Sequence, residues 1–184
     1  ISALIDVALF EVSQLNRTDR AISLLQQALD IQPDNWNVLH TLSHLLESDE
    51  DWPQAAIIYE KMGDLSSGGI ASHYYLEAGL IHEEQSGQLA EAVRLLQKAY
   101  ESNPSDSETF ITYERLLRQT ENSDTRIQLY LGLAQQHPAQ RQAWIKRAAY
   151  VAIESGEFAK AESIILNEKS FLSSLLLKNK DNSL

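Results

Sequence analysis

Two histidines stand at the spacing at which neighbouring imidazoles on one helix can share a zinc ion. His40 and His44 are four residues apart, within a segment whose apolar residues follow a helical period. Further ligands would have to come from a later segment, which contains His73, His82, Glu83 and Glu84. The alternative, polar side chains that face a groove, needs no such convergence. We therefore predict no metal site and no cofactor, and keep as a hypothesis that these histidines make ligand binding sensitive to pH.

Other patterns that support catalysis or phosphate binding are weak. Ser66-Ser67-Gly68-Gly69 could hold an anion at the start of the next helix, but no Lys or Arg accompanies it, so a plain connecting loop is the simpler interpretation. There is no Gly-x-Gly-x-x-Gly, no Gly-Lys-Ser/Thr and no cysteine. The acidic run 47–51 is typical of a solvated turn, in which Asp51 can cap the following helix. We predict no catalytic residues and no enzymatic activity.

Paired helices must position the remaining polar side chains. Apolar residues recur every three or four positions in two blocks at a time, separated by a short polar or Gly-containing turn. Proline stops a helix and sets the turn into the next one, and Pro33, Pro104 and Pro138 end three such pairs. No period-two alternation is long enough for a strand, so the sequence predicts an all-α fold. The expected helices are at about 2–15, 18–31, 35–48, 52–63, 70–86, 88–102, 106–119, 123–136, 140–155 and 157–168.

The paired blocks resemble the tetratricopeptide repeat, in which small residues alternate with large ones at set positions. The third repeat matches most closely, through Tyr75, Ala78, Gly79, His82, Ala92, Leu96, Ala99 and Pro104. The resemblance implies a right-handed superhelical solenoid of about five helix-turn-helix hairpins in a single array over 1–184. The repeats are expected at about 2–35, 36–71, 72–106, 107–140 and 141–169. A C-terminal helix at about 170–179 follows, suggested by Phe171, Leu172, Leu175 and Leu176.

Two departures from the family pattern predict local irregularities. Arg126 stands where the fourth repeat should have a small residue, so that hairpin is splayed or the arginine extends outward to water. The second repeat lacks its proline and ends in Asp64-Leu65-Ser66-Ser67-Gly68-Gly69. A flexible joint there would alter the superhelical step, or would divide the array into two parts.

Charge is unevenly distributed along the chain. The formal net charge is −11 over 184 residues. Residues 1–92 contain 15 Asp and Glu against 3 Lys and Arg, whereas residues 93–184 contain 11 against 12. An acidic first half repels nucleic acid and anionic lipid, so we do not expect nucleic-acid binding. The longest uninterrupted apolar stretches are only a few residues, so we do not expect membrane insertion either. A basic protein segment remains open as a partner.

In tetratricopeptide proteins the first helix of each hairpin lines a groove that receives a peptide or a partner helix. The candidate groove residues lie on the faces of these helices that are not needed for packing. They are Asp6, Phe10, Asn37, His40, His44, His73, Leu76, Glu83, Glu108, Ile111, Arg115, Arg118, Gln142 and Ile145. The exposed apolar members would serve as anchors.

Arg115 and Arg118 form a possible basic patch in this groove. They stand three residues apart on one helix face and could hold a carboxylate or phosphate bidentately. The alternative is pairing with Glu114 or Glu121. Members of the family that hold acidic C-terminal tails use a clamp containing lysine, and the matching faces of the first three repeats have no lysine. We do not expect such a clamp here.

The sequence therefore predicts a non-catalytic scaffold that binds a protein or peptide in the groove. A structural spacer or self-assembly module, joined through its terminal hairpins, is the alternative. The chain begins with Ile1, so we expect a piece of a longer protein. It has no address signal; a cytoplasmic location is favoured over a periplasmic or exported one.

Overall fold

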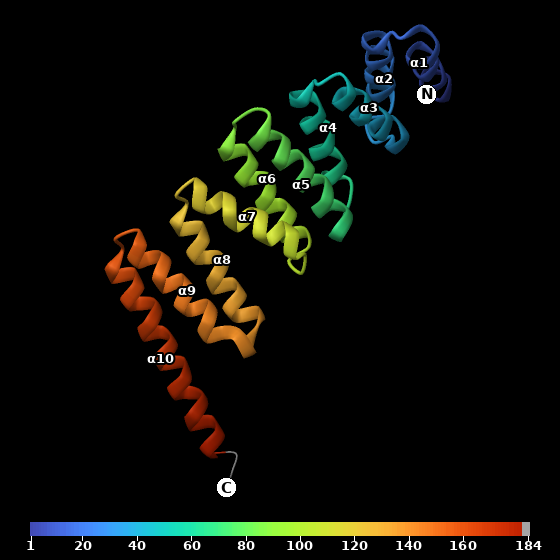
Figure 1. The fold of residues 1–184 in the computed structure, drawn as a ribbon. Coiled ribbons are helices and arrows are strands. Elements are labelled where there is room, and N and C mark those ends of the chain that lie inside the picture. Colours follow the sequence, from blue (N-terminus) through green and yellow to red (C-terminus); the bar gives the residue numbers. More distant parts are fainter. Residues whose placement is uncertain (182–184) are drawn as a thin grey trace. The chain divides into compact units, whose positions relative to one another are not determined.

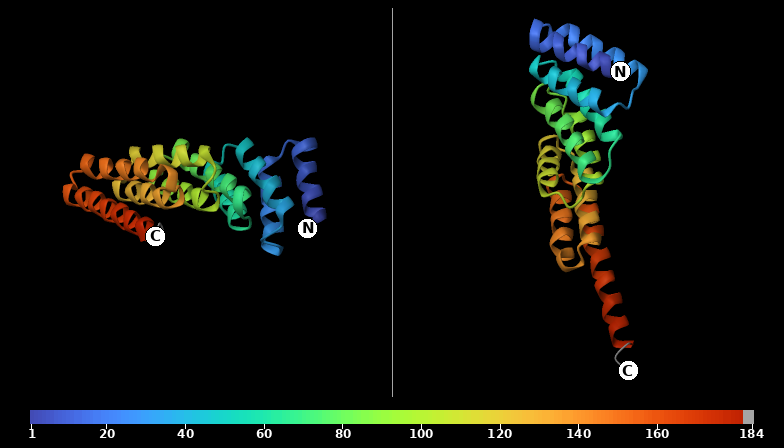
Figure 2. Two further views of the ribbon diagram at one scale, coloured as in Figure 1. Left: turned by 90° about the horizontal axis from the view of Figure 1, so that it is seen from below. Right: turned by 90° about the vertical axis from the view of Figure 1, so that its right-hand side faces the viewer.

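The structure, a computed structural model, describes the backbone of residues 1–181 and the side chains of residues 1–171. Within this range every regular element is helical, which confirms the all-α fold. Consecutive helices pair into hairpins (Figures 1 and 2). The elements are α1 (Ser2–Leu15), α2 (Thr18–Ile31), α3 (Trp36–Ser48), α4 (Trp52–Asp64), α5 (Gly68–Glu84), α6 (Leu89–Ser102), α7 (Ser107–Gln119), α8 (Ser123–Gln136), the 3-10 turn η1 (Pro138–Gln140), α9 (Arg141–Glu154) and α10 (Phe158–Asp181).

The chain divides into two compact units. The N-terminal unit comprises Ile1–Leu116 and the C-terminal unit Leu117–Leu184. The segment expected to be a flexible joint lies inside the N-terminal unit, where α4 ends at Asp64 and α5 begins at Gly68. The idea that this segment separates two parts of the array is therefore wrong.

The same turn closes all five hairpins. In each pair, a residue with positive φ stands one to three positions after the last residue of the first helix, where the chain reverses. These residues are Asn16, Glu50, Gly87, Glu121 and Gly156. The amide just after each one donates to a carbonyl five or six residues earlier, as Asp51 does to Leu46 at 2.9 Å and Glu157 does to Ala152 at 2.7 Å. These bonds satisfy carbonyls that the helix end would otherwise leave unpaired.

Small residues lie where helices approach most closely, as expected. Ala21, Ala55, Ala92 and Ala161 are all buried. A Cβ placed on Gly79 of α5 would lie 3.2 Å from Cγ of Leu96 on α6, so these two helices have no room for a larger residue. Arg126 is a correction: it is 8% exposed, so its side chain does not extend into water.

The C-terminal end also differs from the prediction. The last two expected helices, 157–168 and 170–179, form the single helix α10, which is 24 residues long (Figure 1). No Pro or Gly occurs within it, so nothing in the local sequence stops the helix near residue 169. The side chains of Leu172, Leu175 and Leu176 lie outside the described residues, and their proposed capping role stays a prediction.

Gly63 of α4 tests how tightly the hairpins of the N-terminal unit pack. A Cβ there would lie 2.6 Å from Cε1 of Tyr75. That ring cannot easily move, because it is buried and its hydroxyl donates to Asp64 at 2.7 Å. We expect Gly63→Ala to lower the free energy of unfolding by about 1–3 kcal/mol, measured by urea denaturation. The control is Gly132→Ala in α8, where no atom lies within 4 Å of the new Cβ and the same change should stabilise by about 0.5–1 kcal/mol. A stabilising Gly63→Ala would contradict this packing.

Candidate functional site

The first helices of the N-terminal unit lie next to one another. Side chains of α1 and α3 line a common groove. Trp36 of α3 contacts Tyr74 of α5 edge-on, with ring centroids 5.5 Å apart. Ser72 of α5 and Thr109 of α7 share a buried hydrogen bond of 3.3 Å. We call the solvent-facing side of α1, α3, α5 and α7 the first-helix face; its side chains include Asp6, Phe10, Asn37, His40, His44, Glu47, His73, Glu77, Glu108, Ile111 and Arg115.

The groove between α1 and α3 has a volume of about 530 Å³ and mainly polar walls. It is lined by Ser2, Ile5, Asp6, Trp36, Asn37, His40 and Thr41. Asp6 is the one lining residue that is charged at neutral pH, and Trp36, 38% exposed, is the largest apolar surface in it. The structure thus brings the candidate residues Asn37 and His40 into one concavity.

An aromatic cluster lies behind this groove. Tyr74 contacts Trp36, stacks on Tyr59 of α4 at 6.0 Å and contacts His73 at 5.2 Å between ring centroids. The candidate residues did not include Trp36, Tyr59 or Tyr74. A period of 3.6 assigns each to a side of its own helix, but does not show that three helices bring these rings together.

The paired histidines contact each other and not a metal-binding group. The rings of His40 and His44 meet edge-on with centroids 4.5 Å apart. Two carboxylates each lie beside a single imidazole. Nδ1 of His44 is 3.5 Å from Oε2 of Glu47, and Nδ1 of His73 is 3.8 Å from Oε1 of Glu77. Among the described residues, no three His, Cys, Asp or Glu side chains are grouped so that they could hold a metal ion.

Arg115 binds Glu83, and neither Glu114 nor Glu121 as the sequence suggested. Its two terminal nitrogens donate to the two carboxylate oxygens of Glu83 on α5, at 2.6 and 2.8 Å. This bidentate pair holds the pKa of Glu83 below its usual value. The expected partners of the basic patch, Glu114 and Glu121, do not take this role for Arg115. Two candidate groove residues therefore neutralise each other, and Arg115 is not available as a free anion clamp.

Glu77 has the opposite electrostatic environment. Burial is the main cause that raises its pKa, and the nearby carboxylates of Glu47, Glu108 and Glu84 raise it further, while His73 lowers it. These carboxylates come from α3, α7 and α5. Glu47 also accepts a hydrogen bond of 2.7 Å from the hydroxyl of Tyr59. Negative charge from three successive first helices is thus concentrated in one region, of which the sequence-based groove candidates included Glu108 but not Glu47 or Glu77.

Only two of the four expected apolar anchors are exposed. Phe10 and Ile111 are 55% and 63% exposed. Leu76 and Ile145 are buried among their neighbours and cannot serve as exposed anchors. In a helix each residue turns by about 100° from the last, so positions at the edge of a face are easily assigned to the wrong side.

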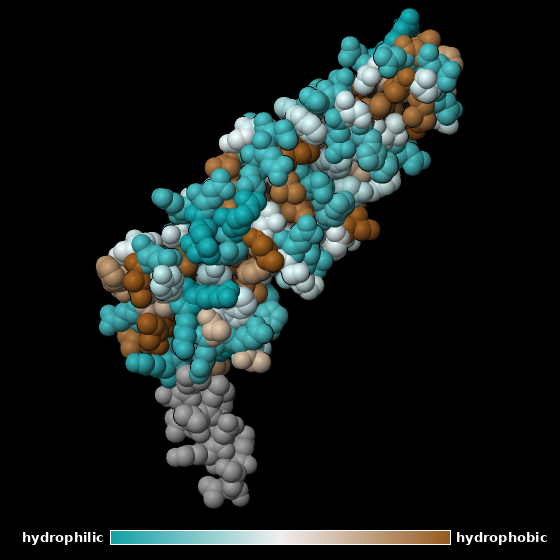
Figure 3. Space-filling model, viewed as in Figure 1, coloured by the Kyte–Doolittle hydropathy of each residue, from teal (hydrophilic) through white to brown (hydrophobic). Residues whose placement is uncertain are grey.

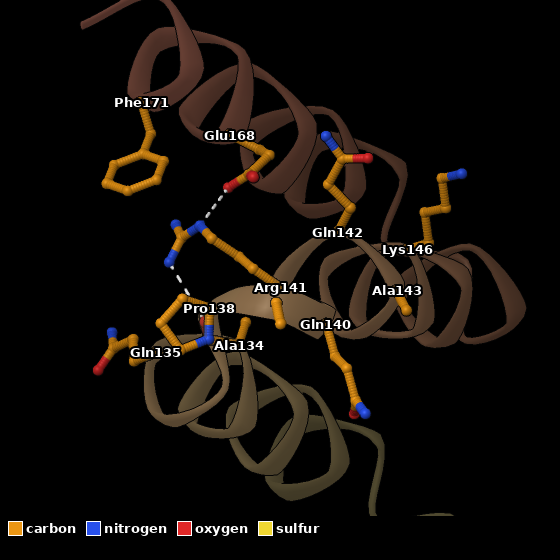
Figure 4. A pocket seen from close by; sticks show the side chains of 11 residues that line it. Ala134, Gln135, Pro138, Gln140, Arg141, Gln142, Ala143, Lys146, Glu168 and Phe171 are labelled. Carbon is orange, nitrogen blue, oxygen red and sulfur yellow. Dashed lines mark hydrogen bonds and ion pairs between the residues drawn. The ribbon is translucent and has the colours of Figure 1, made fainter. Parts of the chain in front are cut away.

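Three candidates, Arg118, Gln142 and Ile145, belong to the C-terminal unit. A groove that continues from the N-terminal unit through these residues stays a prediction. Gln142 lines a separate open pocket of about 1030 Å³ (Figure 4). There Nε of Arg141 donates to Glu168 at 2.9 Å, and its guanidinium lies 4.0 Å from the centroid of the Phe171 ring. These contacts fix α10 against the start of α9.

Hydropathy varies over the visible surface. Hydrophilic side chains cover much of the visible surface, with separate hydrophobic patches between them (Figure 3). None of the described helices combines the length and the apolar character needed to cross a bilayer.

The contrast between Glu77 and Glu83 gives a matched pair of substitutions on one helix. Because the pKa of Glu83 is lowered in the folded state, this carboxylate stabilises the fold at pH values above the ordinary Glu pKa, and the effect is lost on acidification. Because the pKa of Glu77 is raised, its ionised form opposes folding, and this effect disappears once Glu77 is protonated. At pH 7 we expect Glu83→Gln to lower the free energy of unfolding by about 0.5–1 kcal/mol and Glu77→Gln to leave it unchanged or raise it. Urea denaturation at pH 7 and about pH 4 should show both differences shrinking at the lower pH. A larger loss in Glu77→Gln than in Glu83→Gln would contradict this assignment.

Comparisons with known proteins found similar solved structures and one family model. The solved structures found include MamA (TM-score 0.49, 15% identity, covering 89% of this chain and 87% of that one) and YrrB, described as a TPR protein with an unusual peptide-binding site (0.47, 17%, 98% and 91%). Naa15/Naa10 bound to HypK-THB has a TM-score of 0.52 at 16% identity, covering 92% of this chain and 25% of that one. At these identities the likeness concerns the fold alone. A search of curated proteins found no match.

A family model supplies the more specific result. The tetratricopeptide repeat model matches residues 13–35 and 72–106, which correspond to the end of the first expected repeat and to the whole of the third. The resemblance inferred from the sequence is thereby confirmed. Residues 13–35 and 72–106 of this chain thus match the tetratricopeptide repeat, within an all-α series of helical hairpins.

Proposed function

We propose that this chain is a non-catalytic scaffold that binds an extended peptide or a protein segment on the first-helix face. The observation that carries the proposal is the continuity of that face in the N-terminal unit. Four first helices are joined side by side through the α1–α3 groove, the Trp36–Tyr74 contact and the Glu83–Arg115 pair. A binding segment could therefore contact several repeats at once.

The character of the face supports binding over catalysis. Phe10 and Ile111 offer exposed apolar contacts, Trp36 offers an aromatic one, and Asn37 offers an amide. Interfaces use a few such residues as the main source of affinity. The tetratricopeptide pattern implies the same use of first helices. By contrast, His40 and His44 contact each other, Glu47 accepts a hydrogen bond from Tyr59 and Glu83 binds Arg115, and these pairings favour structure over proton transfer.

Two isoleucines of equal exposure allow a direct test of which side binds. Ile111 lies on first helix α7 and Ile57 on second helix α4, and both are 63% exposed. The photo-reactive residue benzoylphenylalanine would replace each in turn, and the protein would be irradiated in a lysate of the source organism. We expect a specific partner to cross-link at position 111 and not at position 57.

Mass spectrometry of the cross-linked peptide identifies the partner segment. The label at position 57 controls for general stickiness of the chain, because it has the same chemistry and the same exposure. Cross-linking that is equal at both positions, or confined to position 57, would contradict binding on the first-helix face.

Self-association is a second candidate, which one observation favours. In the C-terminal unit, α9 and α10 form an almost entirely apolar groove of about 350 Å³. Its lining includes Ile145, Tyr150, Ile153 and Ile165, of which the last three are partly exposed. Light scattering over a hundredfold range of concentration should then show a mass that rises with concentration in the native protein and not in an Ile153→Glu variant. A constant monomer mass would exclude this candidate.

A further inference from the structure

Charge divides between the two units more sharply than between the two halves of the sequence. Residues 1–116 contain 19 Asp and Glu against 6 Lys and Arg, a net charge of −13. The rest of the chain contains 7 against 9, a net charge of +2. The unit that contains the first-helix face therefore carries all of the excess negative charge.

Most positive side chains of the N-terminal unit are already engaged by carboxylates. On the second helices, Arg94 binds Glu60 at 2.7 Å and Lys98 binds Glu60 at 2.9 Å, which lowers the pKa of Glu60 to about 2. Arg17 and Arg20 both lie within 4 Å of Glu11. These contacts lie away from the first-helix face and leave its charge unchanged.

On the face itself the negative charge is not neutralised. Arg115, the one arginine of this face that belongs to the N-terminal unit, is bound bidentately by Glu83. Within the N-terminal unit, no Lys or Arg pairs with any of the four other carboxylates of the face, which are Asp6, Glu47, Glu77 and Glu108. Burial is the main cause of the raised pKa of Glu77, and the neighbouring carboxylates Glu47 and Glu108 raise it further, as expected where such groups are crowded. An anionic ligand would add to this repulsion, whereas a cationic one would relieve it.

Aromatic groups stand beside these carboxylates. Trp36 lines the α1–α3 groove together with Asp6 and His40, and its ring is held by Tyr74 behind it. The face of a Trp ring attracts Lys and Arg side chains, and a neighbouring carboxylate strengthens the attraction. The groove therefore combines the two groups that recognise a cationic side chain.

Building on the proposed function, we infer that the ligand of the first-helix face is a basic protein segment, bound with Lys or Arg side chains over Trp36 and among Asp6, Glu47, Glu77 and Glu108. In an extended chain, alternate side chains point to the same side and lie about 7 Å apart. Neighbouring helices lie about 8–10 Å apart. Successive basic side chains can thus reach successive rows of carboxylates.

Two synthetic peptides of opposite charge test this inference. Each has about ten residues, because an extended chain rises about 3.3 Å per residue and four adjacent helices span about 27 Å. One alternates Lys with Ser and the other alternates Glu with Ser, and both carry fluorescein at the N-terminus. Fluorescence anisotropy should show binding of the Lys peptide at about 50 mM salt, at least tenfold weaker binding at about 300 mM salt, and no binding of the Glu peptide.

Matched variants separate a defined site from general attraction to an acidic protein. Asp6→Asn with Glu108→Gln removes two charges from the face, and Asp30→Asn with Glu101→Gln removes two from the exposed sides of α2 and α6. We expect the first pair to weaken binding of the Lys peptide by at least fivefold and the second pair by less than twofold. Circular dichroism would check that both variants keep the helical fold.

Several results would overturn the inference. Equal losses in the two variants would mean diffuse attraction, and binding of the Glu peptide would mean that the charge of the ligand was assigned wrongly. If neither peptide binds while a natural partner cross-links at position 111, this inference fails and the proposed function stands. If cross-linking occurs only at position 57, the proposed function itself fails.

Discussion

A two-helix hairpin buries only one side of each helix, and this limit shapes the whole chain. Each hairpin becomes stable by stacking on the next, so the helices must approach closely over a long contact. Fully buried Ala21, Ala55 and Ala92 permit that approach, and Leu25 and Leu96 fill the space beside them. The first helices commit one side to this core. Their other side is released to present polar and aromatic groups, which is why a binding face can exist at all.

The features of the fold that depend on local sequence could be predicted. Helical period and proline position place the helices to within two residues of those observed, apart from the end of the last one. Both signals act over a few neighbouring residues, so no knowledge of the partner helix is needed. The fused α10 was missed because the helical-hairpin pattern was repeated up to residue 168 and the apolar stretch that follows was taken as a separate helix, whereas the sequence there contains no Pro or Gly.

The candidate site depends on contacts between repeats, which cannot be read from the local pattern of the sequence. Arg115 binds Glu83, which is 32 residues away in the sequence, and not Glu114 on its own helix. The reason is that the neighbouring helix α5 places the Glu83 carboxylate opposite the Arg115 guanidinium. The cluster of Trp36, Tyr59 and Tyr74 likewise needs three helices to meet. Leu76 shows the same difficulty for burial, since a residue at the edge of a helix face is covered or exposed according to what packs beside it.

The similar turns at Asn16, Glu50, Gly87, Glu121 and Gly156 also bear on how the chain folds. Each turn joins two helices that are adjacent in sequence, so most of the structure can form from short-range contacts. Chains of low contact order fold in microseconds to milliseconds, and a repeat array can start from any hairpin and grow in either direction. During synthesis each hairpin can therefore close as it leaves the ribosome and offer the next one a surface on which to form.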